Sequence, residues 1–369
     1  MSDERFETRA VHAGLEPDPG FGSVIPAIHQ SSTFAQRSVG DVVGEYDYSR
    51  AANPTRSALE RALGDLEGGH GSAFASGMAA THALVTAVCN AGDHIVIPAD
   101  LYGGTYRLVD KVLSRWGLRY TMVDQTDLDA LAAAVADDTR LIWVETPTNP
   151  LLNVVDVAGV VARRRNALVA VDNTFATPAN QRPLEDGADA VVHSTTKYLG
   201  GHSDVIGGAV VVRDAGLHEE VRFVQKSIGA VPGPLDCFLV HRGLRTLAVR
   251  MRAHAESAAA VSEWLRSSAE GAYDVRWPGF SGMVSFRHPD AVAIAEATKL
   301  FTLAESLGGV ESLIEVPQAM THQTVEGSDA AVPADLIRLS CGIEAPEDLV
   351  ADLASAFARV ADRSAALRA

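Results

Sequence analysis

The sequence predicts an α/β fold with a mostly parallel central sheet, followed by a smaller C-terminal α+β domain. Short apolar, β-branched runs alternate with helical stretches up to residue 212. Such alternation is typical of a parallel sheet that helices cover on both faces. After about Leu235 a long helical stretch leads into a smaller set of strands and helices. Ligands of parallel sheets bind beyond the carboxyl ends of the strands, so we expect functional residues just after them.

The N-terminal part of the chain divides into an irregular segment and a first helix. Residues 1 to about 50 lack strong periodicity and contain several prolines and glycines, which indicates a functional or interaction arm. Asn53-Pro54 is a strong helix start, and Gly68-Gly69 ends that helix. A second helix is predicted from Gly77 to Val88.

The remaining elements follow from periodicity and from glycine or proline breaks. In the first part we predict strands at 94–98, 118–123, 141–145, 168–172, 190–193 and 206–212, with helices at 108–116, 127–136 and 157–165. In the second part we predict helices at 239–268, 291–299 and 346–367 and strands at 282–287 and 336–340. The predicted domains are an arm at 1–50, a large domain at 51–238 and a small domain at 239–369.

Composition and charge limit the class of protein. The 369 residues are 47% hydrophobic and 21% charged, and the net charge of −16 argues against nucleic acid or an anionic membrane as a partner. Three distant cysteines form no CxxC motif, and the histidines are scattered, so we predict no metal site. The sequence has no signal-peptide pattern and no run long enough to span a membrane, so we expect a cytoplasmic protein.

Lys197 is the most informative single residue. It follows a β-branched strand and Ser194, and a glycine-rich loop and a second β-branched strand come after it. Burial lowers the pKa of an amine and makes it a nucleophile. In extended backbone, Ser194 and Thr196 would point to one side and Lys197 to the other, an arrangement that could hold a phosphate and an aldehyde of one molecule. A strand-end lysine with loop hydroxyls is the alternative.

Two more strand ends suggest the same ligand. Asp172 ends an apolar strand and precedes Asn173 and Thr174, where a carboxylate can hold the protonated ring nitrogen of pyridoxal phosphate. Capping of the next turn is the commoner role of such an aspartate. Ser76-Gly77-Met78 at a predicted helix start could bind a phosphate, and Tyr102 could stack on a flat ring.

Two arginines could bind anions. Tyr48 and Arg50 lie in the irregular N-terminal segment and suit a phosphate group. Arg338 lies on an apolar strand and could bind a substrate carboxylate in bidentate fashion, although a strand arginine is more often a surface or ion-pair residue. Nucleotide-loop, zinc-protease and serine-hydrolase motifs are all missing from the sequence.

With these residues in hand, the chain resembles the Cys/Met-metabolism family of pyridoxal-phosphate enzymes, which includes cystathionine γ-synthases and cystathionine and methionine lyases. The resemblance extends from residue 8 to the terminal helix. The stretches that carry it are 46–56, 76–78, 102–107, 144–150, 171–175, 193–204, 303–309, 320–322 and 338–340. It implies a fold of the aspartate-aminotransferase type (fold type I), with pyridoxal 5′-phosphate as cofactor.

The resemblance also implies roles for individual residues. Lys197 would attach the cofactor and move protons, Asp172 would hold the ring nitrogen, and Tyr102 would stack on the ring. The phosphate cradle would comprise Gly77, Met78, Ser194 and Thr196, with Thr174 also at the cofactor, while Tyr48 and Arg50 would reach the site of a neighbouring subunit. Residues implied at the substrate are Asp47, Arg107, Asn149, Glu305, Ser306 and Arg338. The family is commonly a homotetramer, a dimer of dimers with shared sites.

The reaction that we predict is γ-replacement, in which an O-acyl-L-homoserine and L-cysteine give L-cystathionine. γ-Elimination of cystathionine to cysteine, 2-oxobutanoate and ammonia is the alternative, as is a related γ-substitution of specialised metabolism. Asp47 and Glu305 could together bind the amine of cysteine. Gly104 stands where methionine γ-lyases have a cysteine, which counts against that activity. The stretch 276–283 is shorter than in most relatives.

Overall fold

The computed structural model describes residues 4–18, 20–321 and 332–368. It has a seven-stranded sheet in the order β3-β9-β8-β7-β6-β4-β5 and a separate five-stranded sheet in the C-terminal part. Pairing is parallel from β8 through to β5, and only β9, between β3 and β8, runs antiparallel to its neighbours. The predicted fold class is confirmed.

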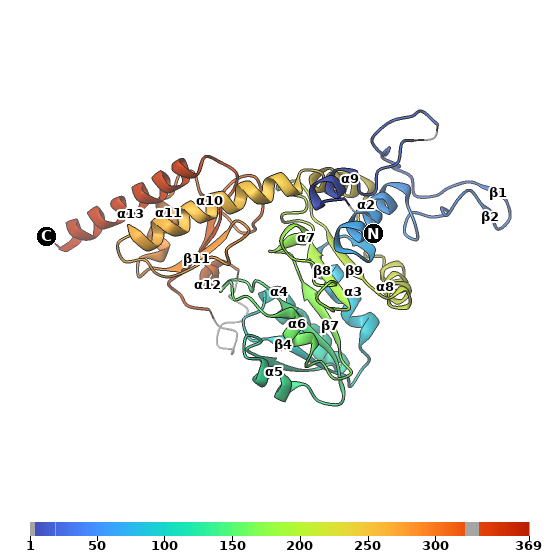
Figure 1. Cartoon of the computed structure of the whole chain (residues 1–369), viewed down its shortest axis with the longest axis horizontal. Coiled ribbons are helices and arrows are strands. Elements are labelled where there is room, and N and C mark those ends of the chain that lie inside the picture. The colour runs from blue at the N-terminus through green and yellow to red at the C-terminus, as the bar shows by residue number, and fades with distance from the viewer. Residues whose placement is uncertain (1–3, 19, 322–331, 369) are drawn as a thin grey trace.

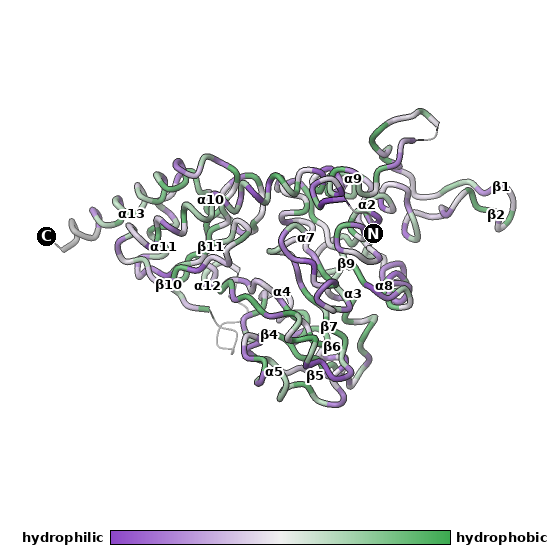
Figure 2. Tube along the Cα trace, in the orientation of Figure 1, coloured by the Kyte–Doolittle hydropathy of each residue, from purple (hydrophilic) through white to green (hydrophobic). Residues whose placement is uncertain are grey.

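The large sheet consists of strands that are mostly buried. The strands are β3 (His70–Phe74), β4 (His94–Pro98), β5 (Arg119–Val123), β6 (Thr139–Glu145), β7 (Leu168–Asp172), β8 (Ala190–Ser194) and β9 (Gly208–Val212). Their β-branched runs form the hydrophobic interior of this domain, seen as continuous green stretches in Figure 2. The strand ends that carry functional candidates lie at one edge of the sheet, because β4, β6, β7 and β8 are parallel. The antiparallel strand β9 starts at the same edge, with Gly208 opposite Ser194.

Helices cover both faces of this sheet (Figure 1). They are α2 (Pro54–Glu67), α3 (Gly77–Val88), α4 (Gly103–Arg107), α5 (Leu128–Ala134), α6 (Val157–Val161), α7 (Thr177–Asn180), α8 (Ala215–Ile228) and α9 (Pro234–Leu244). Asn53 caps α2 as predicted, since its side chain accepts the amide hydrogens of Thr55 and Arg56. The predicted helix at 108–116 is instead a π-helical turn, Leu108–Val112, followed by a 3₁₀ turn, Leu113–Trp116.

The C-terminal part packs α10 (Leu247–Ser267), α11 (Ala291–Ala297), α12 (Pro317–Met320) and α13 (Pro346–Arg368) around the smaller sheet. Its strand order is β10-β11-β14-β13-β12, from β10 (Tyr273–Arg276), β11 (Met283–Arg287), β12 (Thr302–Leu303), β13 (Leu313–Glu315) and β14 (Leu336–Ser340). The single helix predicted at 239–268 is two helices, α9 and α10. Helix α10 leads from the large domain to the C-terminal sheet (Figure 1).

The N-terminal segment contains more structure than its composition indicated. Helix α1 (Phe6–His12) packs on α2, and a short hairpin of β1 (Gln36–Ser38) and β2 (Asp41–Val42) stands away from the body (Figure 1). Apolar side chains of this segment are strongly exposed, with Phe21 at 96%, Val24 at 71% and Val39 at 105% of the full accessible area. In the described part of the chain, no helix combines the length and apolarity needed to cross a bilayer.

Candidate active site

A cavity of about 260 Å³ lies at the carboxyl edge of the large sheet, facing the C-terminal part. The loops that follow β3, β4, β6, β7 and β8 all contribute to its wall. The predicted site residues that line it are Gly77, Met78, Tyr102, Asn149, Asp172, Thr174, Ser194, Thr196, Lys197, Glu305, Ser306 and Arg338. Residues that lie far apart in the sequence, and that belong to the large domain and to the C-terminal part of the chain, therefore meet in one cavity.

Lys197 lies in the turn after β8. Its Nζ donates a hydrogen bond of 2.6 Å to the hydroxyl of Ser306, and burial, with the positive charge of Arg338, lowers the pKa of the amine to about 8. Ser306 has a φ of 91°, which is unusual for a residue with a side chain. The extended backbone that was assumed for Ser194, Thr196 and Lys197 is not found. Strand β8 ends at Ser194, so the alternation does not extend to Lys197, and all three residues line one cavity.

Two carboxylates stand side by side at the strand ends, that of Glu145 buried and that of Asp172 half-buried. Glu145 and Asp172 are register partners on β6 and β7. Burial and the negative charge of Asp172 raise the pKa of Glu145, and burial also raises the pKa of Asp172, although the amide of Thr174 donates to it at 3.0 Å. Because both groups are withdrawn from water, a cation placed beside them would relieve their repulsion.

Glu145 also connects two loops of the cavity, a role that the sequence analysis did not assign. Its Oε2 accepts the amide hydrogen of Tyr102 at 2.9 Å, and its Oε1 accepts that of Asn149 at 2.7 Å. The signal that could have found it is its place at the end of an apolar strand, directly before the loop that was predicted to be functional. Glu145 therefore holds together the loops that follow β4 and β6.

The opposite end of the cavity combines a helix N-terminus with hydroxyl groups. Helix α3 begins at Gly77, and its first N–H groups have no acceptor within the helix. A Cβ atom at Gly77 would lie 2.9 Å from the Cβ of Ser194, so only glycine fits here. Two of the hydroxyls already bind backbone, since Thr174 accepts from the amide of Ser194 and Thr196 accepts from that of Gly207. This end suits an anion.

Arg338 on β14 is held from several sides. Its guanidinium donates to Asn149 Oδ1 at 2.8 Å and to the main-chain oxygen of Ser306 at 2.9 Å, and it forms a 3.0 Å ion pair with Glu315. Arg338 and Glu315 are almost completely buried, and the Arg338 Nε has no partner among the described residues. Glu315 was not predicted from the sequence, where it stands as one charge at the end of a short apolar strand.

Tyr102 directly precedes α4 and is 39% exposed, and partial burial raises the pKa of its phenol. A Cβ atom at Gly104 would come within 2.4 Å of the Tyr102 ring, so a larger residue there would displace the ring. Arg107, predicted at the substrate, is exposed at the end of α4 and does not line the cavity.

The predicted residues of the arm are also outside this cavity. Asp47, Tyr48 and Arg50 are exposed, and the Arg50 guanidinium donates to the main-chain oxygen of Lys226 at 2.8 Å. The predicted pair of Asp47 and Glu305 is not assembled within one chain, because Glu305 alone lines the cavity. The stretch 276–283 connects β10 to β11, and Arg276 at the end of β10 donates to Leu151 and Asn153 of the large domain. Of the stretch 320–322, His322 lies outside the described residues.

The cavity fits pyridoxal phosphate on observations of this structure. Three features of the cavity match the aldehyde, the ring nitrogen and the phosphate of that molecule. They are a half-buried amine of lowered pKa, a carboxylate pair that favours a cation, and a helix start where Gly77 lets the backbone come close to Ser194.

Comparison with known proteins agrees. Residues 7–358 match the family described as Cys/Met metabolism PLP-dependent enzyme. The cystathionine gamma-synthase of Mycobacterium tuberculosis is 52% identical over 373 residues, covering 95% of this chain and 96% of the relative. The cystathionine beta-lyase of Lactococcus lactis is 47% identical over 377 residues, covering 95% of this chain and 98% of the relative.

A crystal structure of metB from Corynebacterium glutamicum superposes with a TM-score of 0.96 at 47% identity, covering 97% of this chain and 99% of that one. The matched region is longer in the Mycobacterium relative than in this chain, so that relative has additional residues within it. The chain therefore belongs to the Cys/Met-metabolism family of pyridoxal 5′-phosphate enzymes, whose members act as transferases or carbon–sulfur lyases.

Proposed function

We propose that the protein catalyses γ-replacement, joining an O-acyl-L-homoserine to L-cysteine to give L-cystathionine. The observation that carries this proposal is the position of Glu305 in the same cavity as Arg338 and Lys197. Arg338 can bind the α-carboxylate of one amino acid, and Glu305 adds a negative charge that can bind the ammonium group of a second one. The Mycobacterium relative named cystathionine gamma-synthase supports the same reaction.

Some residues of the cavity bind the substrate and the cofactor, and others transfer protons. Arg338, steered by Glu315 and Asn149, binds the substrate carboxylate and so fixes the Cα atom. When pyridoxal phosphate is bound, Asp172 would hold its ring nitrogen, Tyr102 would cover the ring, and the N-terminus of α3 with Ser194 and Thr196 would bind the phosphate. Pyridoxal phosphate, when bound, withdraws electrons from the substrate Cα.

Proton movement falls to Lys197, with Tyr102 as a second acid or base. With a pKa of about 8, roughly a tenth of the Lys197 amine is neutral at pH 7, far more than for an ordinary lysine, and this neutral form can accept a proton from Cα. Once it has passed that proton on, it can accept a second one from Cβ. Its hydrogen bond to Ser306 keeps the Nζ beside the carboxylate-binding end of the cavity. The γ-substituent of the substrate then leaves, and the thiol of cysteine takes its place.

We further propose that each site is shared between two subunits, within a homotetramer. Tyr48, Arg50 and Asp47 lie on an arm that exposes apolar side chains, and a second copy of this chain would cover those side chains. Asp47 would then join Glu305 from the neighbouring subunit.

The test of the reaction uses the purified holoenzyme with O-succinyl- or O-acetyl-homoserine, with and without cysteine, and with cystathionine alone. Cystathionine that forms only when both substrates are present supports γ-replacement. Release of 2-oxobutanoate from cystathionine without condensation would make the enzyme a γ-lyase, and pyruvate with homocysteine would make it a β-lyase. Glu305→Gln should raise KM for cysteine more than KM for the acyl-homoserine.

A further inference from the structure

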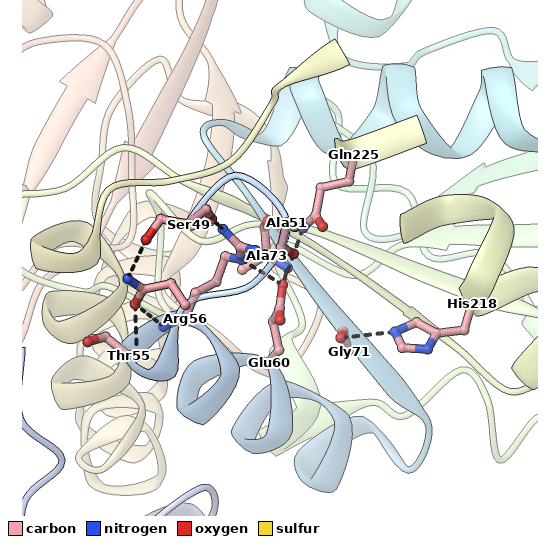
Figure 3. Close-up of polar contacts among 10 residues, drawn as sticks. Ser49, Ala51, Thr55, Arg56, Glu60, Gly71, Ala73, His218 and Gln225 are labelled. Atoms are coloured by element: carbon pink, nitrogen blue, oxygen red, sulfur yellow. Dashed lines mark hydrogen bonds and ion pairs between the residues drawn. The ribbon is translucent and has the colours of Figure 1, made fainter. Parts of the chain in front are cut away.

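Arg56 is a buried arginine that does not line the cavity, and its guanidinium binds backbone oxygens. It lies on the first turns of α2 and is only 2% exposed. Its two terminal nitrogens donate to the main-chain oxygens of Ser49 and Ala51, each at 2.7 Å. Ser49 and Ala51 precede and follow Arg50 in the sequence, and Figure 3 shows both beside Arg56. One guanidinium therefore fixes the backbone on either side of Arg50.

Glu60, one turn further along α2, keeps this guanidinium in place. The Arg56 Nε lies 3.4 Å from Glu60 Oε1, and the same oxygen accepts the amide hydrogen of Ala73 at 3.0 Å and the Gln225 side chain at 3.2 Å. Gln225 also donates to the main-chain oxygen of Ala73 at 2.6 Å (Figure 3). The Glu60 carboxylate is thus tied to β3 and α8, so Arg56 is anchored to the body of the large domain.

A second contact supports the same short segment. The Asn53 side-chain amide donates to Ser49 Oγ at 3.0 Å and to the main-chain oxygen of His29 at 2.9 Å. The side chains of Tyr48 and Arg50 nevertheless remain exposed, with the Arg50 guanidinium 5.6 Å from the centre of the Tyr48 ring. The backbone here is rigidly held while its two functional side chains face outward.

We propose that Arg56 is a positioning residue that presents Tyr48 and Arg50 to the active site of a neighbouring subunit. The inference rests on the shared site proposed above. Only arginine has the planar fork that binds two carbonyls at once, whereas a lysine can hold one of them. Without this fork the segment 49–51 would move, and the phosphate contacts of Tyr48 and Arg50 would weaken in the partner's site while the chain's own cavity stayed intact.

The experiment is subunit mixing with Arg56→Lys. Alone, this variant should retain pyridoxal phosphate about ten-fold less well, because it loses a buried hydrogen bond that orders a ligand-binding segment. Retention is measured from the visible absorbance that remains after gel filtration. Arg61→Lys, an exposed position on the same helix, is the matched control and should retain the cofactor like the unchanged protein.

Mixing separates an effect on the neighbour from an effect within the chain. Arg56→Lys and Lys197→Ala chains with different affinity tags are co-expressed, and mixed assemblies are isolated through both tags. A site with Lys197 from the first chain and the arm from the second is complete, so cofactor retained per Lys197-bearing chain should rise several-fold above Arg56→Lys alone. A mixed assembly that retains no more would show that Arg56 acts within its own chain, and would overturn the proposal.

A second mixture, of Arg50→Ala chains with Lys197→Ala chains, distinguishes a failure of the role proposed for Arg56 from a failure of the proposed shared site. If that mixture also fails to recover, the shared site itself is refuted. If it recovers and the Arg56 mixture does not, only the role of Arg56 is refuted. Should Arg56→Lys not fold, Glu60→Gln replaces it, since it keeps the two carbonyl bonds but frees the guanidinium, and it should show the same recovery. Cofactor retention by the Arg56→Lys protein equal to that of the Arg61→Lys control would also overturn the proposal.

Discussion

The cavity at the sheet edge and the N-terminal arm both carry candidate site residues, but they differ in what holds those residues. In the cavity, Glu145 and Arg338 are buried and Lys197 is half-buried, and each bonds to other residues of the same chain. On the arm, Tyr48 and Arg50 are exposed; the backbone beside Arg50 is held by Arg56, and the Arg50 guanidinium has one bond, to the main-chain oxygen of Lys226. A substitution in the cavity should therefore weaken the active site of the chain that carries it. A substitution in the arm should instead weaken the active site of the neighbouring subunit. The following changes test the first half of that contrast.

Lys197→Ala should have the largest effect. The cofactor loses its covalent partner and the reaction loses its proton carrier, so activity should fall by about 10³-fold or more. The visible absorbance of attached cofactor should disappear from the spectrum. Lys299→Ala, an exposed lysine of the small domain, is the control. An unchanged spectrum in Lys197→Ala would contradict the assignment of this lysine.

Arg338→Ala should affect both stability and substrate binding. The change leaves Glu315 buried without its ion-pair partner, and breaking a buried pair costs about 3–5 kcal/mol. Thermal denaturation measures this cost, and steady-state kinetics should show a raised KM for the acyl-homoserine. The double variant Arg338→Ala/Glu315→Gln should regain part of the stability without regaining the KM. Equal recovery of both would argue against Arg338 as a substrate-binding residue.

Glu145→Gln should weaken the cofactor site within its own chain. A glutamine amide nitrogen cannot accept an N–H, so one of the two bonds to the Tyr102 and Asn149 amides is lost. Loss of a charge-assisted bond costs about 1.5–3 kcal/mol, which corresponds to roughly 10- to 100-fold weaker cofactor retention. Asp352→Asn is the control, because that carboxylate likewise binds backbone amides, but in the small domain.

Mixing the Glu145→Gln chain with Lys197→Ala chains should give no recovery of cofactor retention per Lys197-bearing chain. The only sites with a lysine in such a mixture contain the altered Glu145. Recovered cofactor retention would show that Glu145 does not act within its own chain, and would contradict the difference proposed between the cavity and the arm.

The smallest effect concerns pH. Burial lowers the pKa of Lys197 to about 8, and only the neutral amine, which prevails above that pH, can attack the cofactor aldehyde. When pyridoxal phosphate is added to cofactor-free protein, the rate of covalent attachment should rise with pH and be half-maximal near pH 8. Below that pH it should fall about ten-fold per unit. A midpoint near the ordinary lysine value of 10.5 would mean that the amine is not desolvated.

The elements best predicted from sequence are those with uninterrupted apolar runs. The strands at 94–98, 168–172 and 336–340 were found with their observed bounds. Strand β3 was missed, because His-Gly-Ser-Ala-Phe is no apolar run and becomes a strand only by pairing with β9. Helix α8, which packs on α3, was missed too.

The site was predicted in part for a similar reason. Residues after strand ends could be found, because parallel strands bring those ends to one edge. The buried charges Glu145, Glu315 and Arg56 could not be assigned from the sequence. Their functions come from contacts with residues far along the chain, such as Arg338 for Glu315, and no local pattern marks such a partner.

The reversed direction of β9 has a consequence for how the protein loses activity. Ser194, the last residue of β8, pairs with Gly208, the first residue of β9, and both strands lie inside the sheet. The segment that carries Lys197 is therefore held at both of its ends by interior strands. Local opening costs least at frayed ends and most in central strands. Backbone amides of this segment should thus exchange with deuterium only when the large domain as a whole opens. Local unfolding should therefore not displace Lys197 while the large sheet remains folded. We expect the protein to lose the position of this lysine only when it loses the sheet.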